Sequence, residues 1–295
     1  MLTVLAPAKL NLSLEVLSRR TDGYHEIRSV MQTISLCDCL KFQPKPAITF
    51  KSDMPEWALN KSLVSKTVRL IQKTTGSSKG VEIEVAKRIP LLSGLGGDSS
   101  DAATTLLGLN MLWELGLSQG RLLELAAELG SDVSFFLYGG TAMAAGRGEM
   151  VNPLPPLPQK WIILLMPNIP QIPNKTRQLY ASLKASHFTD GQITQRLTAA
   201  LKEGQPLPSP FPFNTFENVA FSRFAKLKVY KEHLLKLGAD NVHLAGAGPA
   251  LFTLLEDKSK AEDLYIRCQQ QGLETYLAET IGGREGLGIQ PLYMS

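Results

Sequence analysis

A glycine-rich stretch decides the fold of this chain: Pro90-Leu91-Leu92-Ser93-Gly94-Leu95-Gly96-Gly97-Asp98-Ser99-Ser100-Asp101-Ala102-Ala103. Apolar residues then recur with a helical period up to Trp113, so the stretch predicts a loop that enters a helix over 99–115. Glycine lets backbone N–H groups approach a ligand closely, and a helix N-terminus presents unpaired donors and the positive end of its dipole. Such a loop is typical of a phosphate-binding site.

Two common phosphate-binding motifs do not fit this loop. A Walker A motif has a lysine followed by serine or threonine after its second glycine, and no lysine follows here. A Rossmann fingerprint counted from Gly94 has a glycine in sixth place, where this chain has Ser99. The hydroxyls of Ser99 and Ser100 are candidates to bind phosphate or magnesium. Taken alone, a tight turn capped by serines accounts for the loop equally well.

Strands and helices interleave along the rest of the chain. An alternating strand over 10–16 puts Lys9 and Asn11 on one polar face. Further strands are predicted over 28–42, 81–85, 161–166, 242–244, 250–255 and 274–280, and further helices over 119–129, 176–183, 220–237 and 258–271. Because the first strands follow one another closely, the order favours an α+β fold over a doubly wound parallel sheet.

A proline-rich segment, Pro153-Leu154-Pro155-Pro156-Leu157-Pro158, is the best candidate for a domain boundary. Its prolines favour a stiff, extended connection between two folded units. A length of 295 residues is also typical of two domains. We therefore predict an N-terminal domain over 1–153 and a C-terminal domain over 154–295.

The composition excludes several classes of protein. The chain has 31 basic and 27 acidic residues, a net charge of +4, and no basic arm, so nucleic acid is not an expected partner. Its three cysteines, Cys37, Cys39 and Cys268, are too few for a disulfide scaffold and indicate reduced thiols in a cytoplasmic protein. The apolar run over 161–166 is far below the roughly 18 residues of a membrane helix, and the N-terminus does not resemble a signal peptide.

Separated motifs make the chain similar to a known superfamily. They are, in chain order, Pro7-Ala8-Lys9-Leu10-Asn11-Leu12, Arg20-Thr21-Asp22-Gly23-Tyr24-His25, the glycine-serine loop, Gly130-Ser131-Asp132-Val133 and Gly246-Ala247-Gly248-Pro249. In this order they resemble the GHMP kinase superfamily. The segment Asp22-Gly23-Tyr24-His25 narrows the resemblance to its 4-diphosphocytidyl-2-C-methyl-D-erythritol kinase family, whose members act in isoprenoid precursor biosynthesis.

The resemblance implies a fold and a set of roles. The N-terminal domain would be ribosomal S5 domain 2-like and the C-terminal domain ferredoxin-like, with ATP and the acceptor substrate meeting between them. Lys9 and Asp132 match catalytic residues, and the residues from Leu91 to Asp101 match the loop around the ATP phosphates. The match to the residues that hold the cytidine-bearing substrate covers Asn11, Tyr24, His25, Thr176 and Tyr180. Magnesium is expected to arrive with ATP, without a tightly bound cofactor or a metal site of the protein itself.

Elementary chemistry is compatible with these roles. A carboxylate at Asp132 can accept the proton of an attacking hydroxyl, and an ammonium at Lys9 can neutralise charge on the transferred group. Tyr24 offers a stacking face for a base, and His25 offers a donor and an acceptor. Two alternatives stay open: a GHMP kinase for homoserine or mevalonate, and a nucleotide- or RNA-binding module without catalysis. The Asp-Gly-Tyr-His segment argues against the first, and the even charge distribution argues against the second.

The chain departs from the superfamily pattern in two loops. Asp98 stands where a further glycine is common, and Ala245 and Ala247 stand where hydroxyl residues are usual. A carboxylate beside ATP phosphates would repel them. We therefore expect the Asp98 side chain to cap the helix that begins near Ser99, with binding of the nucleotide's magnesium as the alternative.

Overall fold

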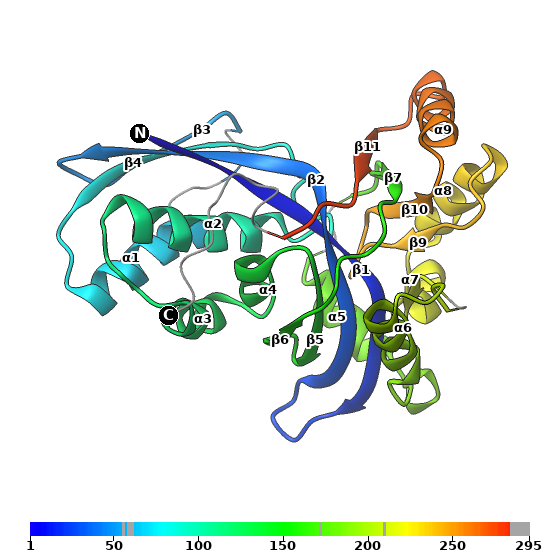
Figure 1. Ribbon diagram of the computed structural model, residues 1–295. Coiled ribbons are helices and arrows are strands. Elements are labelled where there is room, and N and C mark those ends of the chain that lie inside the picture. Colours follow the sequence, from blue (N-terminus) through cyan, green and yellow to red (C-terminus); the bar gives the residue numbers. More distant parts are fainter. Residues whose placement is uncertain (55–56, 58–61, 171–172, 209–210, 284–295) are drawn as a thin grey trace.

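Two β-sheets with helices packed around them form the α+β structure that the sequence predicts. The computed structural model describes residues 1–54, 57, 62–170, 173–208 and 211–283. Figure 1 shows a long pair of strands, β1 and β2, running through the molecule. Helices α1 to α4 lie beside one end of this pair, and the second sheet with α7 to α9 lies beside the other.

The larger sheet is built on β1 (Leu2–Arg19) and β2 (His25–Lys45), which pair antiparallel from Leu2 opposite Phe42 to Arg19 opposite His25. In the described residues it also contains β3 (Thr49–Ser52), β4 (Gly80–Ala86), β5 (Thr141–Gly146), β6 (Met150–Pro153) and β8 (Phe213–Asn214). Its main path runs β3-β4-β2-β1-β8, and β5 joins β2 to β6. Because β8 comes from the second half of the chain, the large sheet joins both halves.

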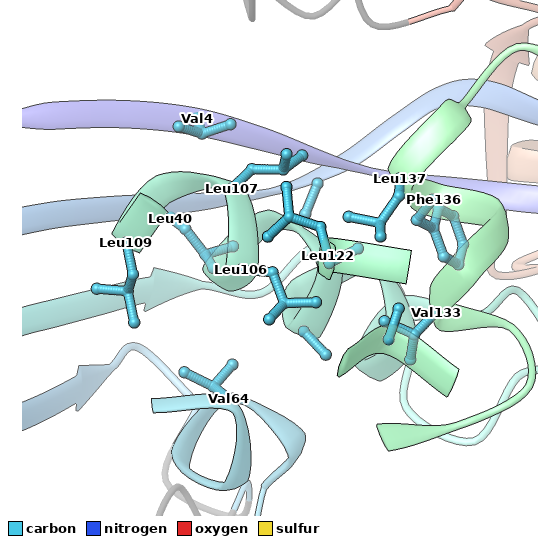
Figure 2. Close-up of a cluster of buried hydrophobic side chains, with 14 of the residues drawn as sticks. Val4, Leu40, Val64, Leu106, Leu107, Leu109, Leu122, Val133, Phe136 and Leu137 are labelled. Carbon is cyan, nitrogen blue, oxygen red and sulfur yellow. The ribbon is translucent and has the colours of Figure 1, made fainter. Parts of the chain in front are cut away.

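Four helices cover one face of this sheet: α1 (Leu63–Thr75), α2 (Gly97–Leu112), α3 (Gln119–Leu129) and α4 (Val133–Tyr138). Figure 2 shows Leu106, Leu107 and Leu109 of α2 among side chains of β1, β2 and the other three helices. Helix α2 is buried along almost its whole length. It is therefore the central element of this core, while Asp98 in its first turn is exposed.

The smaller sheet lies in the second half of the chain. Its strands are β7 (Trp161–Leu165), β9 (His243–Leu244), β10 (Leu251–Leu255) and β11 (Thr275–Glu279), in the antiparallel order β11-β7-β10-β9. Around it stand α5 (Lys175–Ser182), α7 (Glu217–Arg223), α8 (Ala225–Lys236) and α9 (Lys258–Gln270). Helix α6 (Gln192–Glu203) instead packs Leu197 and Leu201 against Leu12 of β1 and Val30 of β2.

Most of the predicted elements are present, with differences at their ends. Helix α3 has the predicted bounds, and the hydroxyl of its N-cap, Ser118, accepts from the backbone N–H of Arg121. The predicted helix over 220–237 is two helices, because the chain leaves helical geometry at Phe224. Helices α1 and α6 and strands β3, β5, β6 and β8 were not predicted. The division of the chain at residue 153 stays a prediction.

Among the described residues, no helix is both long and apolar enough to cross a membrane.

The close approach of α2 to β2 generates a stability prediction. A Cβ added at Gly108 of α2 would lie 2.7 Å from the ring of Phe42, whose side chain is fully buried. Gly108→Ala should therefore destabilise the protein by about 1–3 kcal/mol through overpacking, despite the higher helix propensity of alanine. Gly120→Ala in α3 is the matched control, because its Cβ would meet nothing nearer than 3.9 Å. Urea unfolding checks both, and a Gly108→Ala protein as stable as the wild type would contradict the packing argument.

Candidate active site

The predicted glycine loop bends sharply into the first turn of α2. Gly94 and Gly96 have φ values of +90° and +77°, which side-chain-bearing residues rarely adopt. Gly97 is the first helical residue, and the N–H of Ser100 donates to the carbonyl of Gly96 at 2.9 Å. Ser93 and Leu95 are buried, Leu91 packs on the core, and Leu92 is exposed. Gly94, Gly96 and Gly97 are half-buried, so part of the backbone of this loop remains accessible to solvent.

A second glycine loop, over 245–249 between β9 and β10, lies directly against the first. A Cβ added at Gly94 would lie 2.2 Å from the carbonyl oxygen of Ala245 and 2.9 Å from the nitrogen of Gly248. The N–H of Ala250 donates to the carbonyl of Ser93 at 3.0 Å. The structure thus brings the third and fifth sequence motifs together, backbone against backbone.

Lys9 of β1 lies where these two loops meet. Its backbone N–H donates to the carbonyl of Leu95 at 2.9 Å, and a Cβ added at Gly246 would lie 3.4 Å from its Nζ. Its Nζ donates to Asn11 Oδ1 at 2.6 Å, which confirms that the two side chains share one face of the strand. Asn11 Nδ2 in turn donates to Ser29 Oγ at 2.8 Å. Lys9 and Asn11 are both buried, so this chain of hydrogen bonds fixes the position of the ammonium.

Asp132 faces the same ammonium from the start of α4. Its Oδ2 lies 3.5 Å from Lys9 Nζ, and its side chain is 39% exposed. Asp132 occupies the N-cap position of α4, yet its carboxylate accepts no capping hydrogen bond from that helix. The carboxylate is thus partly open to solvent and directed at Lys9, an arrangement suited to a proton acceptor beside a positive charge.

A buried ion network lies behind the first loop. Lys87, just after β4, places its Nζ 2.6 Å from Asp38 Oδ2 and 2.8 Å from Asp101 Oδ2, and all three side chains are at most 1% exposed. Asp38 Oδ1 accepts from the backbone N–H groups of Arg88 and Ile89. Burial raises the pKa of Asp101 well above its usual range. The network joins β2, the end of β4 and the first turn of α2, and it therefore holds the loop in place.

The polar side chains at the start of α2 differ in how deeply they are buried. Ser99 is half-buried, whereas Ser100 is fully buried and its Oγ has no hydrogen-bond partner in the described structure. Asp101 is turned inward to Lys87. The interior of this turn thus holds a hydroxyl without a partner beside the ion network.

The expected capping role of Asp98 is wrong. Helix α2 begins at Gly97, with Gly96 at the N-cap position and no side-chain cap. Asp98 therefore lies inside the first turn, where its carboxylate is about half exposed and 4.0 Å from Lys87 Nζ. The helix starts earlier than predicted because two positive-φ glycines complete the bend before Gly97. A carboxylate in a first turn still interacts favourably with the helix dipole.

An aromatic cluster stands at the other side of Asp132. His25 stacks on Tyr180 of α5, with ring centroids 4.6 Å apart and an angle of 18°, and Tyr180 meets Phe216 edge-on. Burial and the charge of Asp132 raise the pKa of Tyr180 to about 12. Burial, with a smaller effect from Arg19, lowers the pKa of His25, so its imidazole is neutral at pH 7. Tyr24 is 57% exposed and lies under the guanidinium of Arg147, 4.9 Å from ring centre to Cζ.

Helix α5 carries the last predicted residues. Thr176 is exposed in its first turn, and Tyr180 one turn later reaches His25. Lys175, which the sequence analysis did not single out, donates to carbonyls of both glycine loops. Lys87 and Asn214 were also missed, although Asn214 Nδ2 fixes the second loop by donating to the carbonyls of Leu244 and Gly246. In the residues that the structure covers, no cluster of acidic, histidine or cysteine side chains has the geometry of a metal site.

The ion network generates a second stability prediction. Lys87→Met leaves two buried carboxylates without their cation and should lower the free energy of unfolding by about 3–5 kcal/mol at pH 7. Lys41→Met is the control, because Lys41 and Glu84 form an exposed pair whose loss costs at most about 1 kcal/mol. Urea unfolding measures both.

The pH dependence of that loss identifies its cause. Without Lys87, the folded state retains a proton on Asp101 that the unfolded chain releases at neutral pH. The loss should therefore shrink as the pH falls from 7 to 5. Adding Asp101→Asn to Lys87→Met should recover part of the stability, and no recovery would show that buried charge is not the cause.

Comparisons with known proteins agree with this geometry. Residues 62–140 match the family model of the GHMP kinases N terminal domain, and residues 196–272 match that of the GHMP kinases C terminal. A 4-diphosphocytidyl-2-C-methyl-D-erythritol kinase of Dehalococcoides mccartyi is 53% identical over 96% of this chain and 99% of its own length. The enzyme of that name from a Geobacillus species is 36% identical over 97% of this chain and 99% of its own length.

Solved structures give the same result. A crystal structure of 4-(cytidine 5'-diphospho)-2C-methyl-D-erythritol kinase matches with a TM-score of 0.81 and 33% identity, over 96% of this chain and 100% of that one. A homoserine kinase from Cytophaga hutchinsonii matches with a TM-score of 0.68 and 20% identity, over 97% of this chain and 96% of its own, and so shares the fold. The chain therefore belongs to the GHMP kinases and, within them, to the family of the 4-diphosphocytidyl-2-C-methyl-D-erythritol kinases.

Proposed function

We propose that this chain is a kinase that transfers the terminal phosphoryl group of ATP to a hydroxyl of 4-diphosphocytidyl-2-C-methyl-D-erythritol, a step of isoprenoid precursor biosynthesis. The observation that carries the proposal is the Lys9–Asp132 pair, with 3.5 Å between Nζ and Oδ2, beside the contact of the two glycine loops. Such a pair provides a proton acceptor and a positive charge next to a phosphate-binding backbone. The names of the relatives supply the acceptor, and the aromatic cluster is suited to its cytosine base.

Each of these groups has its own part in the proposed phosphoryl transfer. Phosphoryl transfer needs accurate positioning and stabilisation of charge more than covalent chemistry. The backbone N–H groups at Gly94 to Gly97 and the start of α2 bind the ATP phosphates. Asp132 accepts the proton of the attacking hydroxyl, and Lys9 stabilises the negative charge on the transferred group. Asn11 keeps the ammonium between Asp132 and the loops through its 2.6 Å hydrogen bond.

Aromatic side chains of the protein bind the cytosine of the acceptor substrate in this proposal. Tyr24, which is more than half exposed, offers an open face on which the cytosine can stack. His25 is neutral at pH 7, so one ring nitrogen donates and the other accepts, as the edge of a cytosine requires. Tyr180 holds the imidazole by stacking on it, and Thr176 lies one turn earlier on α5.

Magnesium enters this proposal as part of the ATP complex. The ion is usually held by substrate phosphates, waters and one or two carboxylates, so a dedicated protein cage is not required. Asp98, about half exposed in the first turn of α2, is the loop carboxylate suited to face such an ion. The cytoplasm is the compartment that we propose, because it supplies ATP and keeps the thiols of the three cysteines reduced.

The catalytic pair is tested by Asp132→Asn. An amide cannot accept the proton, so kcat should fall by about 10²–10⁴-fold while the Kd for ATP stays close to that of the wild type. Lys9→Ala should also lower kcat. Asp263→Asn on α9, an exposed helix surface, is the control and should leave kcat unchanged. The measurement is ATP consumption with the cytidyl acceptor, and near-wild-type kcat in either site variant would remove that residue from the mechanism.

The same assay decides between acceptors. Homoserine and mevalonate, the acceptors of two structurally similar kinase classes, should give no turnover above the background ATPase rate. Turnover of either one at the rate of the cytidyl acceptor would overturn the proposed substrate and retain the reaction type.

Acceptor recognition is tested by Tyr24→Ala and His25→Ala. Loss of a stacking face should raise the KM for the cytidyl acceptor by roughly 5- to 100-fold, with little change in kcat, because stacking stabilises ground and transition state alike. His25→Ala should in addition reduce the discrimination between cytidyl and uridyl acceptors. The KM for ATP should be unaffected in both variants. Unchanged discrimination in His25→Ala would show that the imidazole does not read the base.

A further inference from the structure

Lys175 lies where the two glycine loops meet. It is the first residue of α5, and its Nζ donates to the carbonyl of Leu92 at 2.9 Å and to the carbonyl of Gly248. Leu92 belongs to the first loop and Gly248 to the second. The ammonium therefore contacts both loops, as Lys9 does on the other side near Gly246.

This cation differs from the other two lysines of the site because, among the residues that the structure describes, it has no carboxylate partner. Lys87 is bound by two buried aspartates, and Lys9 lies 3.5 Å from Asp132. Within the described ranges of the chain, no carboxylate oxygen lies within 4.0 Å of Lys175 Nζ. Burial alone lowers the pKa of Lys175 to about 8. The ammonium is thus partly removed from water, and its partners in the described structure are two neutral carbonyls.

An ammonium in these surroundings is suited to an anion. Two carbonyls use two of its three N–H donors, and the third remains for a ligand. A partly desolvated cation without an opposite charge is unfavourable, and a bound anion would remove that disadvantage. The anion that fits between these loops is a polyphosphate, because their backbone also supplies the positive end of α2 and the N–H groups of a glycine-rich bend.

We propose that Lys175 is a further nucleotide-binding residue, whose ammonium binds the phosphates of a nucleoside triphosphate held by the two glycine loops. The proposal rests on the proposed function only in taking ATP as the nucleotide. In the free protein the two carbonyls hold the side chain in position, so it does not need to be ordered when ATP binds. Lys9 then acts on the transferred group from one side of the loops, and Lys175 binds phosphate from the other.

The first test is direct binding of ATP–Mg²⁺ to the full chain without an acceptor, by calorimetry. Lys175→Ala should raise the Kd for ATP by about tenfold to a hundredfold, the effect of losing one charge-assisted hydrogen bond. The Kd for adenosine, which has no phosphate, should stay unchanged. Arg177→Ala is the matched control, since it removes a positive charge from the same exposed turn of α5 and should leave both affinities unchanged.

A second variant keeps the test independent of folding defects. Lys175→Arg retains the charge at all accessible pH values, whereas the wild-type ammonium begins to lose its proton near pH 8. The cationic form binds ATP, so the wild-type Kd should rise between pH 8 and 9.5, and that rise should be absent in Lys175→Arg. Other charged groups on the neighbouring elements include Asp98 on α2, Arg177 on α5, Glu217 and Arg223 on α7, and Lys9 with Asp132, and the arginine variant retains all of them.

The outcomes separate this inference from the proposed function. An unchanged ATP affinity in Lys175→Ala, an equal loss for adenosine, or identical pH profiles for wild type and Lys175→Arg would each overturn it. A wild-type chain that binds ATP without phosphorylating the cytidyl acceptor would overturn the proposed function and leave this inference standing. Normal turnover of that acceptor by the wild type, together with unchanged ATP affinity in Lys175→Ala, would overturn this inference and leave the proposed function standing.

Discussion

The contact on which the site depends joins two backbone segments from opposite halves of the chain. At Gly94 the first loop lies so close to the second that a Cβ would be 2.2 Å from the carbonyl of Ala245, and the φ of +90° also favours glycine. The hydrogen bond from Ala250 to Ser93 holds the loops together. Because Lys9 contacts Gly246 on one side and Lys175 contacts Gly248 on the other, both cations owe their positions to this contact.

The three lysines around the loops differ in how far neighbouring carboxylates compensate their charge. We infer a different role for each lysine from this difference. Lys87 is fully buried between two aspartates, which neutralise its charge. This ion network holds α2 against β2 and β4. Lys9 has one partly exposed partner, Asp132, and can share its charge with a reacting group. In the described part of the chain Lys175 has only carbonyl partners, so under our proposal its charge remains for a ligand. If the proposed roles hold, the same residue type provides a structural, a catalytic and a binding cation within one site.

Local pattern was enough to predict some of this arrangement. Alternation along β1 predicted that Lys9 and Asn11 share a face, and the cap of Ser118 followed from residue type. The start of α2 was misjudged, because Gly94 is packed against the second loop and Gly96 against Phe136 and Lys9, and these distant contacts accompany the positive φ values that bend the chain before Gly97. Lys87 and Lys175 were missed for a related reason. The significance of a lysine depends on which distant carboxylates or carbonyls surround it, and one sequence does not contain that information.

The acceptor and donor ends of the site are connected through Asp132. Its charge adds to burial in raising the pKa of Tyr180, whose ring stacks on His25, and its carboxylate also faces Lys9. A neutral imidazole and a protonated phenol therefore line the acceptor side, while cations line the loop side. Under the proposed function, the ATP phosphates face the lysines, and Asp132 is the anionic group between the two ends. A hydroxyl bound beside Asp132 then has its proton acceptor 3.5 Å from the ammonium that stabilises the transferred group, so one ion pair serves both halves of the transfer.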